Sequence, residues 1–362
     1  MSVALFDIGS GSVGLSLVEF KKGDVPVINF LGRETFYVSD DIDVGRILPL
    51  TFSAIERLRN KMDMTTHISP EEIHCFLSSH LVMSKVGSST ALFDEPQIIT
   101  KDIIHKIAKG ATDPTATDES TVKIEDKIMQ VKLNGYETGR PIGHMAKEIT
   151  VSSFSSFVEK DFLGLLIALL RDLFPVQLVQ FHSFALSSYS VTRDISHNEE
   201  FLVIDVGSEI TEVSVVLRDG LESIISFPHG KSGFLRSLRG TFDNTHREDS
   251  ELKTWARDHF LPDPEREDRI TNAGGLWMKH FAEEVLSRER VVPKKVFMTV
   301  DENSASLYGK LILSAYNNNL WDALVRQVDG DALRDFVKNK SGIRDDHFLM
   351  SEAIFMNKIL YD

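Results

Sequence analysis

The segment most informative about the architecture is VALFDIGSGSVGLSLV, residues 3–18. An apolar run, Val3–Phe6, leads into a turn of Asp, Gly and Ser residues, and a second run follows from Val13 to Phe20. In the second run apolar residues alternate with small ones, which is the period of a strand. Two strands joined by a turn rich in glycine and serine predict a β-hairpin.

The same pattern occurs again in the second half of the chain, from Phe201 to Leu217. At one constant offset, Asp7 aligns with Asp205 and Gly9 with Gly207. Two such turns suit a single phosphate chain, because glycine lets backbone amides approach anionic oxygens closely. The two aspartates can hold Mg²⁺ through its water molecules. The candidate phosphate-binding residues are Asp7, Gly9, Ser10, Gly11, Ser12, Asp205, Gly207 and Ser208.

This repeat resembles the two phosphate loops of the actin and sugar-kinase superfamily, whose halves close around ATP and Mg²⁺. The resemblance implies an α/β fold with two actin-like lobes of the ribonuclease H-like type. It also makes ATP and Mg²⁺ the expected cofactors. By the same resemblance, Thr211 after the second turn is added to the nucleotide-binding residues.

Three further segments resemble the branch that contains the bacterial cell-division protein FtsA and the pilus-assembly protein PilM. The first is residues 183–191. The second is the pair of short stretches Asn134–Tyr136 and Pro141–Gly143, and the third is Phe227–Gly230. The pair resembles a signature of the FtsA subdomain of SHS2 type, which favours FtsA. The late position of Thr211 in its loop is closer to PilM. Both families therefore remain open.

Between the two hairpins, a different residue pattern begins near Ser69. A helix is expected at Lys101–Lys109 and strands at Ile128–Leu133 and Ala146–Ser152, which together indicate a small α+β insertion. A very apolar helix, Phe157–Leu173, is expected to be buried on most sides. The expected division is a first lobe of residues 1–71 and 153–194, an SHS2-like insertion of 72–152, a second lobe of 195–345, and a C-terminal helix of 346–362.

The adenosine side of the expected site departs from the branch, which carries a Thr-Gly-Gly motif. Here the resemblance adds Thr299 to the nucleotide-binding residues, but Val300 and Asp301 follow it, and their side chains would crowd a nucleotide. Glu209 in the second turn would repel phosphate unless a cation screens it. The resemblance also assigns Glu251 and Lys253 to a helix that contacts ribose. We therefore expect weak ATP binding or none, and a pseudo-ATPase scaffold or at most a weak ATPase.

Composition further limits the classes of function and the compartment that are possible. The formal net charge is −14 and the pI about 5.4, which argues against nucleic-acid binding. No apolar stretch reaches the ~18 residues that a spanning helix needs, and the N-terminus shows no signal-peptide pattern. The single cysteine, Cys75, fits a reducing compartment. These features predict a cytoplasmic protein.

The C-terminal segment, residues 348–360, is strongly apolar and has Lys358 as its only basic residue. An interfacial helix usually has a basic face, so packing on the first lobe is the expectation. Peripheral contact with the inner face of the cell membrane is the alternative.

Two functions follow from the resemblance. The first is an FtsA-like division scaffold that self-associates and binds the filament-forming FtsZ. The alternative is a PilM-like adaptor that binds the cytoplasmic tail of an inner-membrane pilus protein. An active enzyme such as a sugar kinase is disfavoured, because Val300 and Asp301 replace the two glycines.

Overall fold

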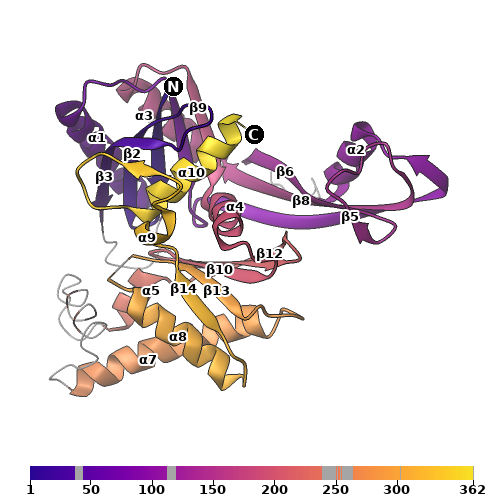
Figure 1. Ribbon diagram of the computed structural model, residues 1–362. Coiled ribbons are helices and arrows are strands. Elements are labelled where there is room, and N and C mark those ends of the chain that lie inside the picture. The colour runs from indigo at the N-terminus through magenta and orange to yellow at the C-terminus, as the bar shows by residue number, and fades with distance from the viewer. Residues whose placement is uncertain are drawn as a thin grey trace.

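The computed structural model describes residues 1–36, 44–111, 120–238, 250, 252, 254, 264–301 and 303–361. The strands of this part of the chain form three sheets, of six, five and four strands. Figure 1 shows the first two sheets as neighbouring lobes and the third extending away from them.

The first sheet has the strand order β15-β3-β2-β1-β4-β9. β1 and β2 form the predicted hairpin, with Asp7 directly opposite Gly14, and β4 and β9 continue the sheet in parallel. The strands are β1 (Ser2–Ile8), β2 (Ser12–Glu19), β3 (Val27–Thr35), β4 (Glu72–Leu77), β9 (Leu178–Ser183) and β15 (Lys338–Asn339). One face is covered by α1 (Val44–Thr65) and α3 (Lys160–Leu173).

The second sheet has the order β12-β11-β10-β13-β14. This order repeats that of β3-β2-β1-β4-β9, so the repeat predicted from the two hairpins is confirmed. Its strands are β10 (Phe201–Val206), β11 (Thr211–Leu217), β12 (Gly220–Phe227), β13 (Lys295–Thr299) and β14 (Leu324–Gln327). Its outer face is covered by α5 (Lys231–Ser237), α7 (Pro264–Phe281), η2 (Ala282–Leu286) and α8 (Ala305–Asn318).

A shared core joins the lobes. The helix α4 (Phe184–Ser196) contacts β9 of the first sheet and β10 and β11 of the second. The C-terminal helix α10 (His347–Tyr361) packs on α4, on β1 and β2, and on the short helix α9 (Gly330–Leu333). Its buried side chains include Leu349, Met350 and Met356. In the described residues, no helix has both the length and the apolar character needed to cross a bilayer.

The third sheet, with the order β5-β8-β6-β7, makes up the insertion. It consists of β5 (Val82–Ile98), β6 (Thr121–Leu133), β7 (Tyr136–Glu137) and β8 (Met145–Glu159), with α2 (Lys101–Ala111) on one face. Figure 1 shows these elements projecting from the two lobes as an arm.

Three boundaries differ from those expected. β4 pairs with β1 and β9, so the predicted start of the insertion at residue 72 is wrong: that strand belongs to the first sheet. β15 also joins the first sheet, by pairing with β3, although 338–339 were assigned to the second lobe. Phe157 lies inside strand β8, which continues to Glu159, and the helix begins at Lys160. That helix buries only one face, since Leu165 is 53% exposed.

Candidate functional site

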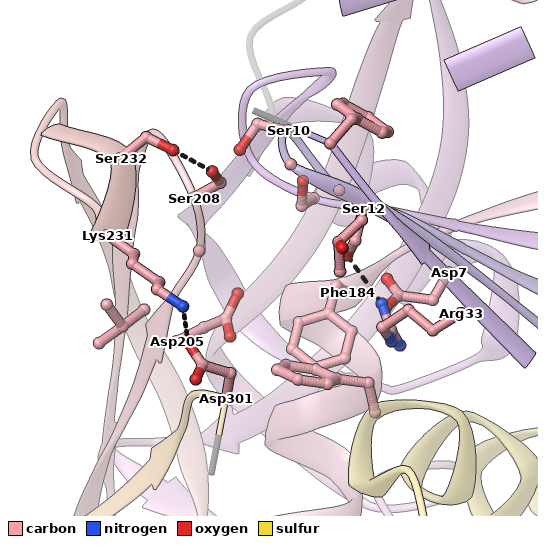
Figure 2. Close-up of a pocket in the computed structure, with 18 residues that line it drawn as sticks. Asp7, Ser10, Ser12, Arg33, Phe184, Asp205, Ser208, Lys231, Ser232 and Asp301 are labelled. Atoms are coloured by element: carbon pink, nitrogen blue, oxygen red, sulfur yellow. Dashed lines mark hydrogen bonds and ion pairs between the residues drawn. The ribbon is translucent and has the colours of Figure 1, made fainter. Parts of the chain in front are cut away.

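The turns of the two hairpins face one cavity between the lobes, about 170 Å³ in volume. A single buried water needs only ~10–15 Å³, so the cavity has room for a small ligand or several waters. Eight predicted residues line it: Asp7, Gly9, Ser10, Gly11, Ser12, Asp205, Gly207 and Ser208. Figure 2 shows that Asp301, expected on the adenosine side, points into this region. So do Arg33, Phe184, Lys231 and Ser232, which the sequence analysis did not assign to the site.

The two turns touch each other. The Ser10 hydroxyl accepts a hydrogen bond of 3.0 Å from the backbone amide of Glu209. A Cβ atom on Gly11 would lie 2.3 Å from Ser208 Oγ, so only glycine allows this approach. The amides of Gly9 and Gly207 donate within their own turns, to Ser12 and Ile210.

In the first lobe, the guanidinium of Arg33 forms an ion pair with the carboxylate of Asp7. Its Nη2 lies 2.7 Å from Asp7 Oδ2, and its Nε lies 2.6 Å from Asp346 Oδ2. Nη1 also donates to Ser12 Oγ at 2.9 Å. Burial disfavours the guanidinium charge, but Asp346 and Asp7 outweigh it and raise the pKa of Arg33. Burial likewise pushes the pKa of Asp346 up, but the charge and hydrogen bonds of Arg33 hold it below its ordinary value.

The second lobe carries no such ion pair at its aspartate among the described residues. Asp205 Oδ1 accepts a hydrogen bond of 2.8 Å from Thr299 Oγ1. Burial raises the pKa of Asp205 to about 7, with a smaller contribution from Asp7. Burial and the nearby Asp205 raise the pKa of Glu212 to about 8. The second lobe therefore holds two buried carboxyl groups whose pKa values burial raises well above their ordinary range.

Glu209 does not face the cavity, which corrects the expectation that its charge would oppose phosphate. Its side chain is 1% exposed and accepts hydrogen bonds from Arg236 at 3.0 and 2.5 Å. Arg236 extends from α5, so the carboxylate is turned into the second lobe and neutralised there.

Neither Thr211 nor Thr299 lines the cavity, so both have structural contacts instead of the predicted ligand contacts. The Thr211 hydroxyl donates to the His229 carbonyl at 2.8 Å and accepts from Trp277 Nε1 at 3.2 Å. Thr299 positions Asp205 through the hydrogen bond described above. The predicted Glu251 and Lys253 lie outside the described residues.

On the adenosine side, Val300 is fully buried, whereas Asp301 reaches the cavity. Lys231 Nζ lies 3.1 Å from Asp301 Oδ2, and Ser232 Oγ lies 2.5 Å from Ser208 Oγ. Figure 2 shows both contacts on the second-lobe wall of the cavity. The only sequence signal for Lys231 and Ser232 was the segment Gly230–Ser232, which does not match a phosphate-binding P-loop.

As arranged, the first turn does not fit a magnesium-bound phosphate chain. The Asp7 carboxylate is bonded to a guanidinium, and the Ser10 hydroxyl is bonded to the opposite turn. In the described part of the chain, no group of three or more His, Cys, Asp or Glu side chains is placed to hold a metal ion.

Compared by sequence, the chain matches no family model and no curated protein. Compared by structure, it resembles the PilM-PilN type IV pilus biogenesis complex at a TM-score of 0.67 and 12% identity, covering 99% of this chain and 98% of that one. It also resembles a glycerol dehydratase reactivase at a TM-score of 0.49 and 9% identity, covering 99% and 100% of the chains. A third similar structure is the ethanolamine utilization protein EutJ from Carboxydothermus hydrogenoformans, at a TM-score of 0.48 and 10% identity, covering 99% and 89%. The chain therefore has the actin-like ATPase fold, in two lobes with an inserted third sheet.

Proposed function

We propose that this chain is a PilM-like adaptor that binds the cytoplasmic segment of an inner-membrane pilus protein and does not act through ATP hydrolysis. The observation that carries the proposal is the placement of Arg33, whose guanidinium engages the carboxylate of Asp7. The likeness to the PilM-PilN complex, which spans nearly the whole of both chains, supports the same reading.

A groove beside the insertion suits such a segment. It lies between β6 and β9 and has a volume of about 470 Å³, larger than the cavity between the lobes. Its walls are formed by Ile124, Glu125, Asp126, Lys127, Val179, Gln180, Phe181, His182 and Ile359. β9 is an edge strand of the first sheet, and an extended peptide can add to such an edge by backbone hydrogen bonds.

The floor of this groove is fixed before any partner binds. Glu125 Oε2 accepts hydrogen bonds of 2.8 Å from both the amide and the hydroxyl of Ser183, and one of 2.9 Å from the Ser156 hydroxyl. The two bonds from Ser183, on β9, join the insertion to the first sheet. A preorganised groove lowers the entropy cost of binding.

Charge supports a basic partner. The chain has a formal net charge of −14. Cytoplasmic segments next to transmembrane helices carry an excess of Lys and Arg, so the two would attract each other. We accordingly place the protein at the cytoplasmic face of the inner membrane, recruited by its partner, and assign the insertion to the SHS2 type.

The test is a fluorescence anisotropy titration with a synthetic peptide. The peptide is the cytoplasmic segment of the inner-membrane pilus protein encoded in the same genome. We expect binding, weakened about tenfold or more by Ile359→Lys, which places a charge of the partner's own sign in the groove. Ile343→Lys is the matched control, because Ile343 is a comparably exposed isoleucine, 50% against 38%, that does not line the groove. Absence of binding, or equal weakening by both variants, would contradict the proposal.

A second candidate function is the FtsA-like division scaffold, favoured by one surface. The distal end of the insertion exposes large apolar side chains: Leu92, Ile98, Tyr136, Ile142 and Met145. Ile98 lies opposite Met145 in the β5–β8 pair, so at least these two adjoin. Exposed apolar clusters mark protein contacts, here self-association or an FtsZ-like partner. Co-sedimentation with FtsZ and lipid vesicles tests it, and Met145→Lys should abolish any polymer that forms.

A further inference from the structure

Arg33 reaches Asp7 by lying across the strand between them. In the register of the sheet, Asp7 on β1 is opposite Gly14 on β2, and Gly14 is opposite Arg33 on β3. Residues directly opposite one another on neighbouring strands project from the same face. A Cβ atom on Gly14 would lie 2.8 Å from Arg33 Nη2 and 3.1 Å from Arg33 Cζ. The missing side chain of Gly14 therefore provides the space that the guanidinium fills.

The start of the C-terminal helix fixes the other side of the guanidinium. Asp346 accepts from Arg33 at 2.6 and 3.0 Å. The same carboxylate accepts hydrogen bonds from the amides of Phe348 and Leu349, at 3.1 and 3.2 Å, and so caps α10. The Phe348 ring lies 5.2 Å from Arg33 Cζ, within range of a cation–π contact. The first turn of α10 is thus built around this arginine.

Among the described residues of the second lobe, the equivalent register positions hold no cation. In its equivalent row, Asp205 is opposite Glu212, and Glu212 is opposite Ser226. The position of Gly14 is taken by an acid and that of Arg33 by a serine. The guanidinium is therefore a particular feature of the first lobe and not a requirement of the repeated hairpin.

We propose that Arg33 is a tethered counter-ion: it takes the cation position at Asp7 in place of a divalent metal ion, and the segment from Asp346 into α10 keeps it there. A metal ion can then reach Asp7 only when the guanidinium leaves. Without the guanidinium, the carboxylates of Asp7 and Asp205, which both line the cavity, would be left as hard oxygen ligands. This inference does not depend on the proposed pilus role.

The test is a titration with Mn²⁺ alone, followed by the electron paramagnetic resonance signal of the free ion. The Arg33→Met variant keeps the aliphatic stem and removes the charge. We expect it to bind one Mn²⁺ about tenfold or more tighter than the unmodified protein, and Asp7→Asn in the same background to remove that site. Arg57→Met is the matched control, because Arg57 pairs with Glu34 on the surface, at 2.9 Å, and should leave Mn²⁺ affinity unchanged.

Gly14→Ala provides an independent variant that retains every charge. Its Cβ would displace the guanidinium, so it should also tighten Mn²⁺ binding. Two results would overturn the proposal. One is tight Mn²⁺ binding by the unmodified protein that Asp7→Asn abolishes. This result can be obtained without a folded variant of Arg33. The other is unchanged Mn²⁺ affinity in Arg33→Met or Gly14→Ala protein whose circular dichroism shows a native fold.

Discussion

The side chain of Ser10 and the backbone amide of Glu209, 199 residues apart, are joined by a hydrogen bond of 3.0 Å that closes the two turns on each other. Beside it, Gly11 packs against Ser208 with no space for a side chain. The two lobes therefore meet through their turns, at the place where a nucleotide-binding actin-like protein would receive a phosphate chain. Stability measurements on this contact test the closed arrangement directly.

Gly11→Ala should destabilise the protein by about 1–3 kcal/mol, because its Cβ would lie 2.3 Å from Ser208 Oγ and force the turns apart. The measurement is the free energy of unfolding in urea. Gly139→Ala is the control, since nothing lies within 4 Å of a Cβ there. Equal stability of the two variants would show that the turns are separated in solution.

Arg236→Ala should lower the free energy of unfolding by about 3–5 kcal/mol, because it leaves the buried charge of Glu209 without its partner. Arg334→Ala removes an arginine from an ion pair with Asp331 of 2.6 Å in which both side chains are largely exposed, and should cost about 1 kcal/mol or less. The additional replacement of Glu209 by Gln should recover part of the loss. A small effect of Arg236→Ala would mean that Glu209 faces the cavity after all.

Stability should fall as the pH rises from about 5 to 8. Burial, assisted by Asp205, raises the pKa of Glu212 to about 8, whereas the unfolded chain keeps an ordinary value near 4.5. The folded protein therefore binds the proton more tightly. The protonated Glu212 carboxyl therefore contributes its full stabilisation below pH 4.5. This contribution is lost as the pH rises through the pKa of about 8 that Glu212 has in the folded protein. The loss is on the order of a few kcal/mol, since one unit of pKa difference corresponds to about 1.4 kcal/mol.

Urea unfolding at several pH values checks this, with Glu212→Gln expected to flatten the decline. Glu137→Gln, at an exposed glutamate of the insertion, should leave the pH dependence unchanged. A decline that Glu212→Gln does not alter would place its origin elsewhere, for example at Asp205, whose pKa burial raises to about 7.

Met356→Ala should cost about 2–5 kcal/mol, because this α10 side chain is fully buried in the core shared by the two lobes. Met64→Ala is the matched control, as Met64 is 82% exposed. Thermal or urea unfolding measures both. Indistinguishable variants would indicate that α10 leaves the first lobe in solution, as a membrane-docking helix would.

The repeated hairpins could be predicted because their signals are local. Alternating apolar residues and an Asp-x-Gly-Ser turn lie within a few positions of each other, and both copies form the predicted strands. The strand β4 was misplaced because its pairing with β1 is parallel and joins residues far apart in the chain, which no local pattern records. The long strand β5 escaped notice because its middle is composed of small and polar residues that are half-exposed.

Prediction of the site was limited in the same way, to features that are local in the sequence. Eight residues of the two turns were identified, since glycine, serine and aspartate mark the turns themselves. Arg33 was missed because its role depends on the register of three strands and on Asp346, 313 residues away. The inward direction of Glu209 likewise depends on Arg236, which lies on a helix of the second lobe. Long-range contacts of this kind decide which of the turn residues remain available to a ligand.

The most direct test of the central claim, that this actin-like protein acts through protein contacts and not through ATP, is a calorimetric titration of the unmodified protein with ATP, with Mg²⁺ and with EDTA. The account predicts no Mg²⁺-dependent heat up to millimolar nucleotide, because Arg33 engages Asp7 and the two turns are closed. Micromolar binding that requires Mg²⁺ and is lost in Asp7→Asn would contradict it.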